Sequence, residues 1–170
     1  MRSNFDEIEK LINNPSLGAY LLWIFCKKHQ DYQEEKQGVP PAYLFCILAL
    51  LFDEDIRKAI ASTQIAKGLR FSLAKLEKSR SNKTDILYSI SKKIKLNKER
   101  SLESILVGLY YGIITINKDS GYIVSIPPDK LNIFNHPQEM NDIIIGAEKL
   151  GYWFSKHNAL EIQEILRIKF

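Results

Sequence analysis

Hydrophobic residues recur along most of the chain at the three- and four-residue spacing of an α-helix. Two segments break this pattern because they are apolar on nearly every side, residues 17–26 and 39–52. A surface helix should be apolar along one stripe only, so both segments predict helices enclosed by other elements. Asn14 before Pro15 provides a helix start for the first segment, and Pro41 provides one for the second.

The remaining periodic segments predict further helices, separated by polar breaks. The predicted helices span residues 4–13, 15–30, 40–52, 56–62, 63–78, 86–95, 102–111, 137–155 and 159–168. Ser101 is the predicted cap of the helix at 102–111. Asn158, with Glu161 three residues later, predicts a capping box for the last helix.

After Gly112 the period changes from that of a helix to that of a strand. Two short apolar runs, 113–116 and 122–126, flank the turn-forming sequence NKDSG and predict a β-hairpin. Three helices followed by a hairpin is the order of elements in a winged helix. We therefore predict a predominantly helical α+β protein with a winged-helix-like centre.

The predicted winged-helix-like part covers residues 63–126. An N-terminal helical part (1–62) and C-terminal helices (127–170) flank it, and we expect all three to form one compact unit. A chain of 170 residues can bury a core without the help of a metal or a disulfide. Hydrophobic residues at 45% and charged residues at 26% are typical of a globular protein and exclude a disordered one.

Cysteine usage and the N-terminal sequence indicate a cytoplasmic protein with no membrane partner. Cys26 and Cys46 both lie in the apolar segments, where reduced cysteines act as small hydrophobic residues. The N-terminal sequence MRSNFDEIEK is polar and acidic, unlike a signal peptide. Neither apolar segment reaches the ~20 residues that cross a bilayer.

No combination of residues predicts catalysis, a cofactor or a metal site. None of the three histidines, His29, His136 and His157, lies beside a nucleophile motif. Cys26 and His29 would align on a helix, but a structural zinc needs four ligands. The acids at 53–55 are better explained as partners of a helix dipole. We therefore expect a protein that is not an enzyme.

Positive charge is concentrated in the middle of the chain. Residues 67–100 hold eleven basic and three acidic residues, so the net charge of +4 divides into +8 for this segment and −4 for the rest. The candidate DNA contacts are Lys92, Lys93, Lys95, Lys98 and Arg100. A solvated basic face is the simpler alternative, since the segment has only Phe71 and Tyr88 as aromatic residues for base stacking.

The helix at 102–111 would have to read DNA if the centre were a typical winged helix. Base edges are read by Arg, Lys, Asn or Gln, whereas this region offers Ser101, Glu103 and Ser104 followed by Leu, Val and Tyr. Its composition favours contact with protein.

Two glycines inside predicted helices indicate close approach of another backbone. Gly18 and Gly151 each cost up to about 1 kcal/mol relative to alanine in mid-helix. The approaching element could be a helix of the same chain, or it could belong to a partner, since exposed apolar patches mark partner sites. The residues that we predict at a partner interface are Asn14, Pro15, Gly18, Tyr20, Trp23, Gly151, Trp153 and Phe154.

Four segments together resemble the middle component of three-component ABC systems. They are NPSLGAYLLWIFC (14–26), PPAYLFCILALLF (40–52), GLRFSLAKL (68–76) and AEKLGYWFSK (147–156), in this order. The resemblance covers nearly the whole chain, and its most specific parts are N-P-x-L-G-A and K-L-G-x-W-F. One departure is the C-terminal sequence ILRIKF, where members of the family often have an ending similar to LG-V-R-P.

The resemblance implies a function that the residues alone do not. Such proteins are encoded between an ABC or SMC-type ATPase and an effector, often a nuclease, in prokaryotic defence against phage and plasmids, as in Lamassu systems. The middle component would be a non-enzymatic adaptor that binds the ATPase, helps position or restrain the effector, and reaches double-stranded DNA through the complex. The alternative is a stand-alone winged-helix DNA-binding regulator.

Overall fold

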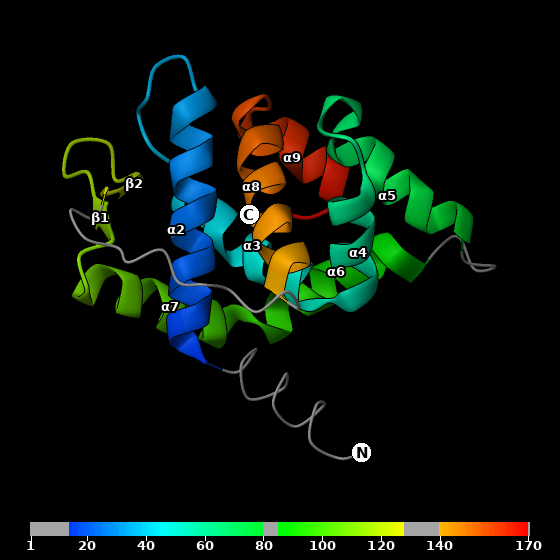
Figure 1. The fold of residues 1–170 in the computed structure, drawn as a ribbon, viewed down its shortest axis with the longest axis horizontal. Helices are drawn as coiled ribbons and strands as arrows, with labels where there is room; N and C mark the ends of the chain where they lie inside the picture. Colours follow the sequence, from blue (N-terminus) through cyan, green and yellow to red (C-terminus); the bar gives the residue numbers. More distant parts are fainter. Residues whose placement is uncertain (1–13, 80–84, 128–139, 170) are drawn as a thin grey trace.

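The computed structural model of the chain describes residues 14–79, 85–127 and 140–169 (Figure 1). Over these residues the fold consists of eight α-helices, a short 3-10 helix η1 (Ile65–Lys67) and one β-hairpin. The helices are α2 (Pro15–Tyr32), α3 (Pro41–Phe52), α4 (Glu54–Ser62), α5 (Gly68–Ser79), α6 (Asp85–Leu96), α7 (Lys98–Tyr110), α8 (Asn141–Ser155) and α9 (Ala159–Leu166). None of the described helices is long and apolar enough to cross a membrane.

Helix α2 is enclosed by its neighbours, as its sequence predicts. Its predicted cap is confirmed, because the Asn14 side chain accepts a hydrogen bond from the Ser16 amide at 2.9 Å. The helix has its most extensive contacts with α8 and α7 and also contacts strand β2 (Ile123–Ser125). All residues from Gly18 to Cys26 except the half-buried Tyr20 are therefore buried.

Helix α3 is the second enclosed helix and lies in the middle of the fold (Figure 1). It contacts α2, α4, α6, α7 and α8. Seven of its residues between Leu44 and Leu51 are buried, which completes one continuous apolar core with the buried side of α2. This explains why its sequence has no polar side.

Helices α4 and α8 are joined at the end of α4. Asp53 caps the start of α4 by accepting a hydrogen bond from the Ile56 amide at 2.9 Å. At the other end, the Lys149 ammonium of α8 donates to the carbonyl oxygens of Ala61 at 2.5 Å and Thr63 at 2.7 Å. The lysine thus satisfies carbonyl groups that the helix leaves unpaired and complements the negative end of its dipole.

The hairpin is attached to α2. Strand β1 (Ile114–Ile116) pairs antiparallel with β2, with Ile116 opposite Ile123, and Val39 adds a bridge to Ile123. From α2, the Trp23 indole N–H donates to the Ile126 carbonyl at 3.0 Å. The predicted hairpin is confirmed, and α2 fixes its position.

The mostly helical fold with one hairpin is confirmed, but the structure does not confirm a winged helix. In a winged helix the three helices before the hairpin pack on one another. Here α5 packs mainly against α4, α6 against α3 and α7 against α2. Elements from all three predicted segments contact α3, and the division at residues 62 and 126 stays a prediction.

Two predicted helix starts are wrong, and the predicted helix at 4–13 lies outside the described residues. The helix predicted from Thr63 begins at Gly68, whose φ of +81° separates it from the 3-10 turn before it. Ser101 is no cap, because α7 already begins at Lys98 and Ser101 is buried within it. The capping box of Asn158 and Glu161 is confirmed.

Candidate partner-binding site

The two glycines that indicated close approach are both used inside the chain. A Cβ atom on Gly18 would lie 2.1 Å from Oγ and 2.8 Å from Cβ of Ser104, on α7. A Cβ atom on Gly151 would lie 2.6 Å from the Phe25 carbonyl oxygen and 3.2 Å from the His29 amide nitrogen, on α2. The glycines therefore allow α7 and α8 to approach α2 closely.

The aromatic residues after Gly151 also have partners within the chain. Trp153 is 2% exposed, and its indole N–H donates to the Ile65 carbonyl at 2.7 Å. Phe154 is fully buried, with its ring edge-on to the rings of Phe25 and Tyr43 at centroid distances of 5.5 and 5.1 Å. A partner could reach these side chains only by displacing elements of this chain.

The other predicted interface residues lie along α2. Asn14 is exposed as the helix cap, and Pro15 is half-buried. Tyr20 is half-buried and stacked on the Trp23 ring at 5.8 Å, and burial raises the pKa of the tyrosine hydroxyl. Contact of the eight residues with a partner stays a prediction, but the structure gives Gly18, Gly151, Trp153 and Phe154 an internal packing role.

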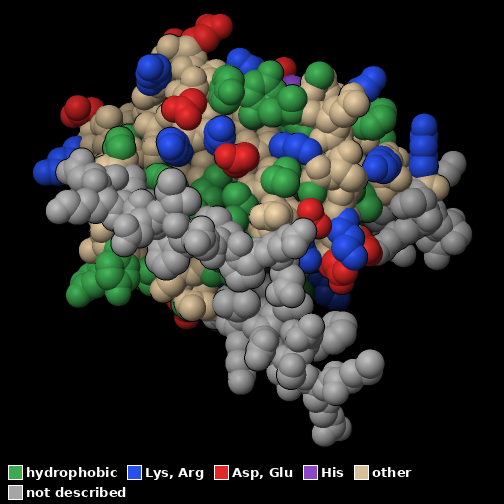
Figure 2. Space-filling model, in the orientation of Figure 1, with side chains coloured by type: hydrophobic (Ala, Val, Ile, Leu, Met, Phe, Trp, Pro, Cys, Tyr) green, Lys and Arg blue, Asp and Glu red, His purple; other side chains and the backbone are tan. Residues whose placement is uncertain are grey.

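A different group of apolar residues is exposed along α7. Leu102, Leu106 and Tyr110 follow one another at intervals of four, which puts them on one side of the helix. Their exposed fractions are 47%, 56% and 84%. Hydrophobic side chains gather in Figure 2 at the lower left, where Figure 1 places the C-terminal end of α7.

Tyr111 and two glutamates extend this exposed side. Tyr111 is 70% exposed and edge-on to the Tyr110 ring at 5.2 Å. Glu99 and Glu103 are exposed, and helical spacing puts them beside the leucines. We call Leu102, Leu106, Tyr110 and Tyr111, with Glu99 and Glu103, the α7 surface. It has the composition of a partner site, because large apolar and aromatic side chains lie together in solvent.

The sequence does contain a signal for the α7 surface, in the spacing of small and large residues along α7. Small residues at Ser101, Ser104 and Gly108 lie on one side of α7 and are buried. Large side chains at spacing four lie on the opposite side. A helix with small residues on one side and leucines on the other has two packing faces, and only the first is covered by α2. Sequence reasoning assigned this helix to protein contact but did not separate the two faces.

The comparison with known families decides the identity. A family model described as ABC-three component (ABC-3C) system Middle Component 3 matches residues 2–170. The chain belongs to this family. The resemblance to middle components is thereby confirmed over nearly the whole chain. Searches among curated proteins and among solved structures gave no match.

As a middle component of a three-component defence system, the protein is expected to associate with the other components. Its exposed basic side chains are the candidates for contact with DNA. Three of the five predicted DNA contacts are exposed: Lys92, Lys95 and Lys98. Lys93 instead forms an ion pair with Asp53. The Arg100 guanidinium lies over the Phe52 ring at 5.3 Å. The structure therefore leaves three lysines of the predicted set facing solvent.

Both cysteines of the middle component and His29 are buried. Burial raises the pKa of the Cys46 thiol to about 12, raises that of the Cys26 thiol as well, and lowers the pKa of His29 to about 4. Both thiols are thus protonated and His29 is neutral at pH 7. Over the described residues, no three His, Cys, Asp or Glu side chains lie close enough to hold a metal ion.

Proposed function

We propose that this middle component is a non-enzymatic adaptor that binds the ABC-type, SMC-like ATPase of its system through the α7 surface. In binding the ATPase it positions or restrains the effector, in the manner that Lamassu-like systems imply. The observation that carries this proposal is the exposed apolar side of α7 on a helix whose other side is fixed to α2.

The α7 surface can provide substantial binding energy. Burying a leucine or a phenylalanine-sized side chain contributes about 1.5–3 kcal/mol. Tyrosines are among the residues that most often dominate an interface. Glu99 and Glu103 favour a partner segment that combines apolar and basic residues.

The α7 surface is also held in place before a partner binds. On the packed side of α7, a Cβ atom on Gly108 would lie 2.9 Å from the Ile114 side chain, so the helix also fits closely against the hairpin. A helix fixed in this way loses little conformational entropy on binding. An adaptor needs this kind of preformed surface, whereas it needs no reactive group.

The decisive variant is Leu106→Asp, because it puts a charge in the centre of the α7 surface and leaves the core untouched. Leu160→Asp on α9 is the matched control, since Leu160 is 71% exposed and lies outside the α7 surface. In co-expression with the ATPase and the effector, we expect Leu106→Asp to reduce co-purification at least about tenfold, a loss of ~1.4 kcal/mol or more. Leu160→Asp should assemble normally. Equal assembly by both variants, with unchanged thermal unfolding, would contradict the proposed site.

A second candidate, the DNA-binding regulator, has the exposed lysines Lys92, Lys95 and Lys98 in its favour. It predicts that the isolated protein shifts duplex DNA at ~150 mM salt and that the affinity falls steeply with salt. The adaptor proposal predicts no such shift by the isolated chain.

A further inference from the structure

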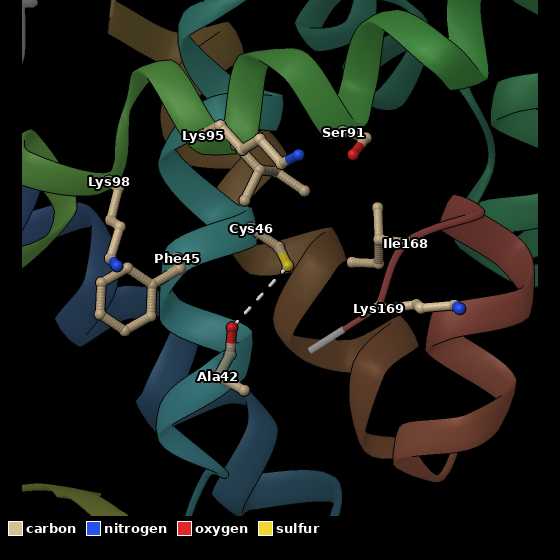
Figure 3. Close-up of a pocket in the computed structure, with 9 residues that line it drawn as sticks. Ala42, Phe45, Cys46, Ser91, Lys95, Lys98, Ile168 and Lys169 are labelled. Atoms are coloured by element: carbon tan, nitrogen blue, oxygen red, sulfur yellow. Dashed lines mark hydrogen bonds between the residues drawn. The ribbon is translucent and has the colours of Figure 1, made fainter.

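A pocket of about 280 Å³ opens between α3 and α6, next to the last described residues of the chain (Figure 3). Its wall is mostly apolar. The apolar residues that line it are Ala42, Phe45, Cys46, Ile94 and Ile168. The Cys46 thiol donates to the carbonyl of Ala42, one turn earlier in α3, at 3.8 Å (Figure 3). The wall therefore offers a mostly apolar surface to an entering side chain, with Ser91 as the one uncharged hydroxyl residue among the described residues that line it.

Three lysines are among the residues that line this pocket. Lys95, Lys98 and Lys169 come from α6, from the start of α7 and from the C-terminal residues, respectively (Figure 3). Within residues 14–79, 85–127 and 140–169, no carboxylate forms an ion pair with any of the three. Lys93, on the same helix, is by contrast paired with Asp53. Three lysines at one pocket, with no ion-pair partner among the described residues, create a local positive potential.

We propose that this lysine-rimmed pocket binds an acidic segment of another protein, with one bulky apolar side chain in the pocket and flanking carboxylates on the three lysines. A volume of about 280 Å³ lies at the lower end of the ~300–1,000 Å³ typical of ligand sites and leaves room for one bulky side chain. The proposal rests on the adaptor function in one respect, because an adaptor needs a second binding surface besides the α7 surface.

The apolar wall favours a protein segment over a nucleic acid. A phosphate backbone could contact the lysines but has no apolar group to fill the pocket. Stacking of successive bases needs several aromatic side chains, and among the described residues Phe45 is the one aromatic residue that lines this pocket. An acidic peptide with an apolar residue uses both the wall and the rim.

The pocket and the α7 surface are neighbours. Lys98 lies one helical turn before Leu102, and Tyr110 lies about 18 Å beyond Lys98 at the helical rise of ~1.5 Å per residue. Partners bound at the two sites would therefore be held side by side, with α7 beneath both.

The test uses the isolated full chain and a fluorescein-labelled synthetic peptide with one phenylalanine between runs of glutamate. Control probes are the same peptide with serine in place of phenylalanine, and a duplex DNA. The charge variant is Lys95→Glu/Lys98→Glu. Its control is Lys92→Glu/Lys118→Glu, which makes the same change of charge at exposed lysines outside the pocket. A third variant, Ser91→Phe, fills the pocket without changing the charge.

We expect saturable binding of the phenylalanine peptide that weakens at least about tenfold in Lys95→Glu/Lys98→Glu and changes less than about twofold in the control variant. Ser91→Phe should lose the same binding at unchanged charge. Leu106→Asp should keep it, so failure at the α7 surface is distinguishable from failure here. The proposal is overturned if the serine peptide binds equally well, if both charge variants lose binding equally, or if only DNA binds.

Discussion

At the scale of single residues, two glycines of α8 differ in what lies next to them: Gly151 faces backbone atoms, and Gly146 faces a side chain that can move. The Cβ of an alanine at Gly151 would meet backbone atoms of α2, at 2.6 Å from the Phe25 carbonyl oxygen. At Gly146 it would meet the far end of the Leu51 side chain at 2.8 Å, which can rotate away. Alanine has the same helix propensity at both positions, so a difference in stability between the two variants reports the steric requirement for glycine at Gly151.

Gly151→Ala should destabilise the protein by about 1–2 kcal/mol, because overpacking against backbone costs up to ~3 kcal/mol and alanine returns up to about 1 kcal/mol of helix propensity. Gly146→Ala should stay within about 1 kcal/mol of the wild type or gain stability. Urea denaturation of both variants measures the difference. Equal stability of the two would show that α2 and α8 do not meet at Gly151 as described.

His29 makes stability depend on pH. It is buried beside the rings of Phe25 and Tyr43, and burial lowers its pKa from 6.5 to about 4. Between pH 6.5 and about pH 4, His29 is protonated in the unfolded chain but neutral in the folded chain. The free energy of unfolding therefore falls as the pH falls through this range. With 1.36 kcal/mol per unit of pKa, the loss is about 3 kcal/mol.

The His29→Leu variant isolates this contribution from those of the carboxylates. We expect the wild type to lose about 3 kcal/mol more than the variant between pH 7 and pH 4, measured by urea denaturation at each pH. Parallel losses in the two proteins would mean that His29 is protonated in the folded state.

Residue-level reasoning found the close contacts but not their partners. Gly18 and Gly151 were correctly identified as points of close approach. Whether Ser104 of the same chain or a helix of another protein would fill the space is a non-local question, and helical spacing carries no information about it. Trp153 and Phe154 were misleading for the same reason, since large aromatic residues are typical of cores and of interfaces alike.

At the scale of elements, the start and end of each helix decide how the core closes. The Lys149 side chain links α8 to the end of α4 by donating to two carbonyl groups, and desolvation lowers the pKa of its ammonium. The helix itself leaves such carbonyl groups unpaired, so they depend on this cation.

Lys149→Met should destabilise the protein by about 1–3 kcal/mol, because it leaves partly buried carbonyl groups unsatisfied. Lys58→Met is the control, as Lys58 forms an exposed pair with Glu54 that is worth ~0–1 kcal/mol. Thermal unfolding of both variants tests the comparison. A Lys149→Met protein as stable as the control would show that Lys149 does not stabilise the end of α4.

Element boundaries were predictable where a capping side chain marks them. Asn14 and Asn158 were read correctly, since a side-chain oxygen after a polar break is a strong local signal. The prediction for Ser101 is wrong because this serine also follows polar residues, whereas α7 begins three residues earlier and Ser101 is buried within it. Because the small residues of α7 were not recognised as its buried side, the exposed side of α7 was not predicted either.

At the scale of the whole molecule, the fold surrounds two apolar helices with less hydrophobic ones. The sequence predicted the enclosure of α2 and α3 and the hairpin after α7. It could not predict that α5, α6 and α7 would each pack on a different helix, because the order of elements does not fix their packing. The winged-helix expectation failed to find support for this reason.

An adaptor function requires above all that the middle component assemble with the ATPase of its system. The most direct measurement is co-expression of the unmodified chain with the ATPase and the effector, followed by affinity purification and determination of the mass of the complex. We predict a stable complex that contains the middle component and the ATPase. A chain that purifies alone, and that by itself shifts duplex DNA at ~150 mM salt, would contradict the adaptor function and favour the regulator.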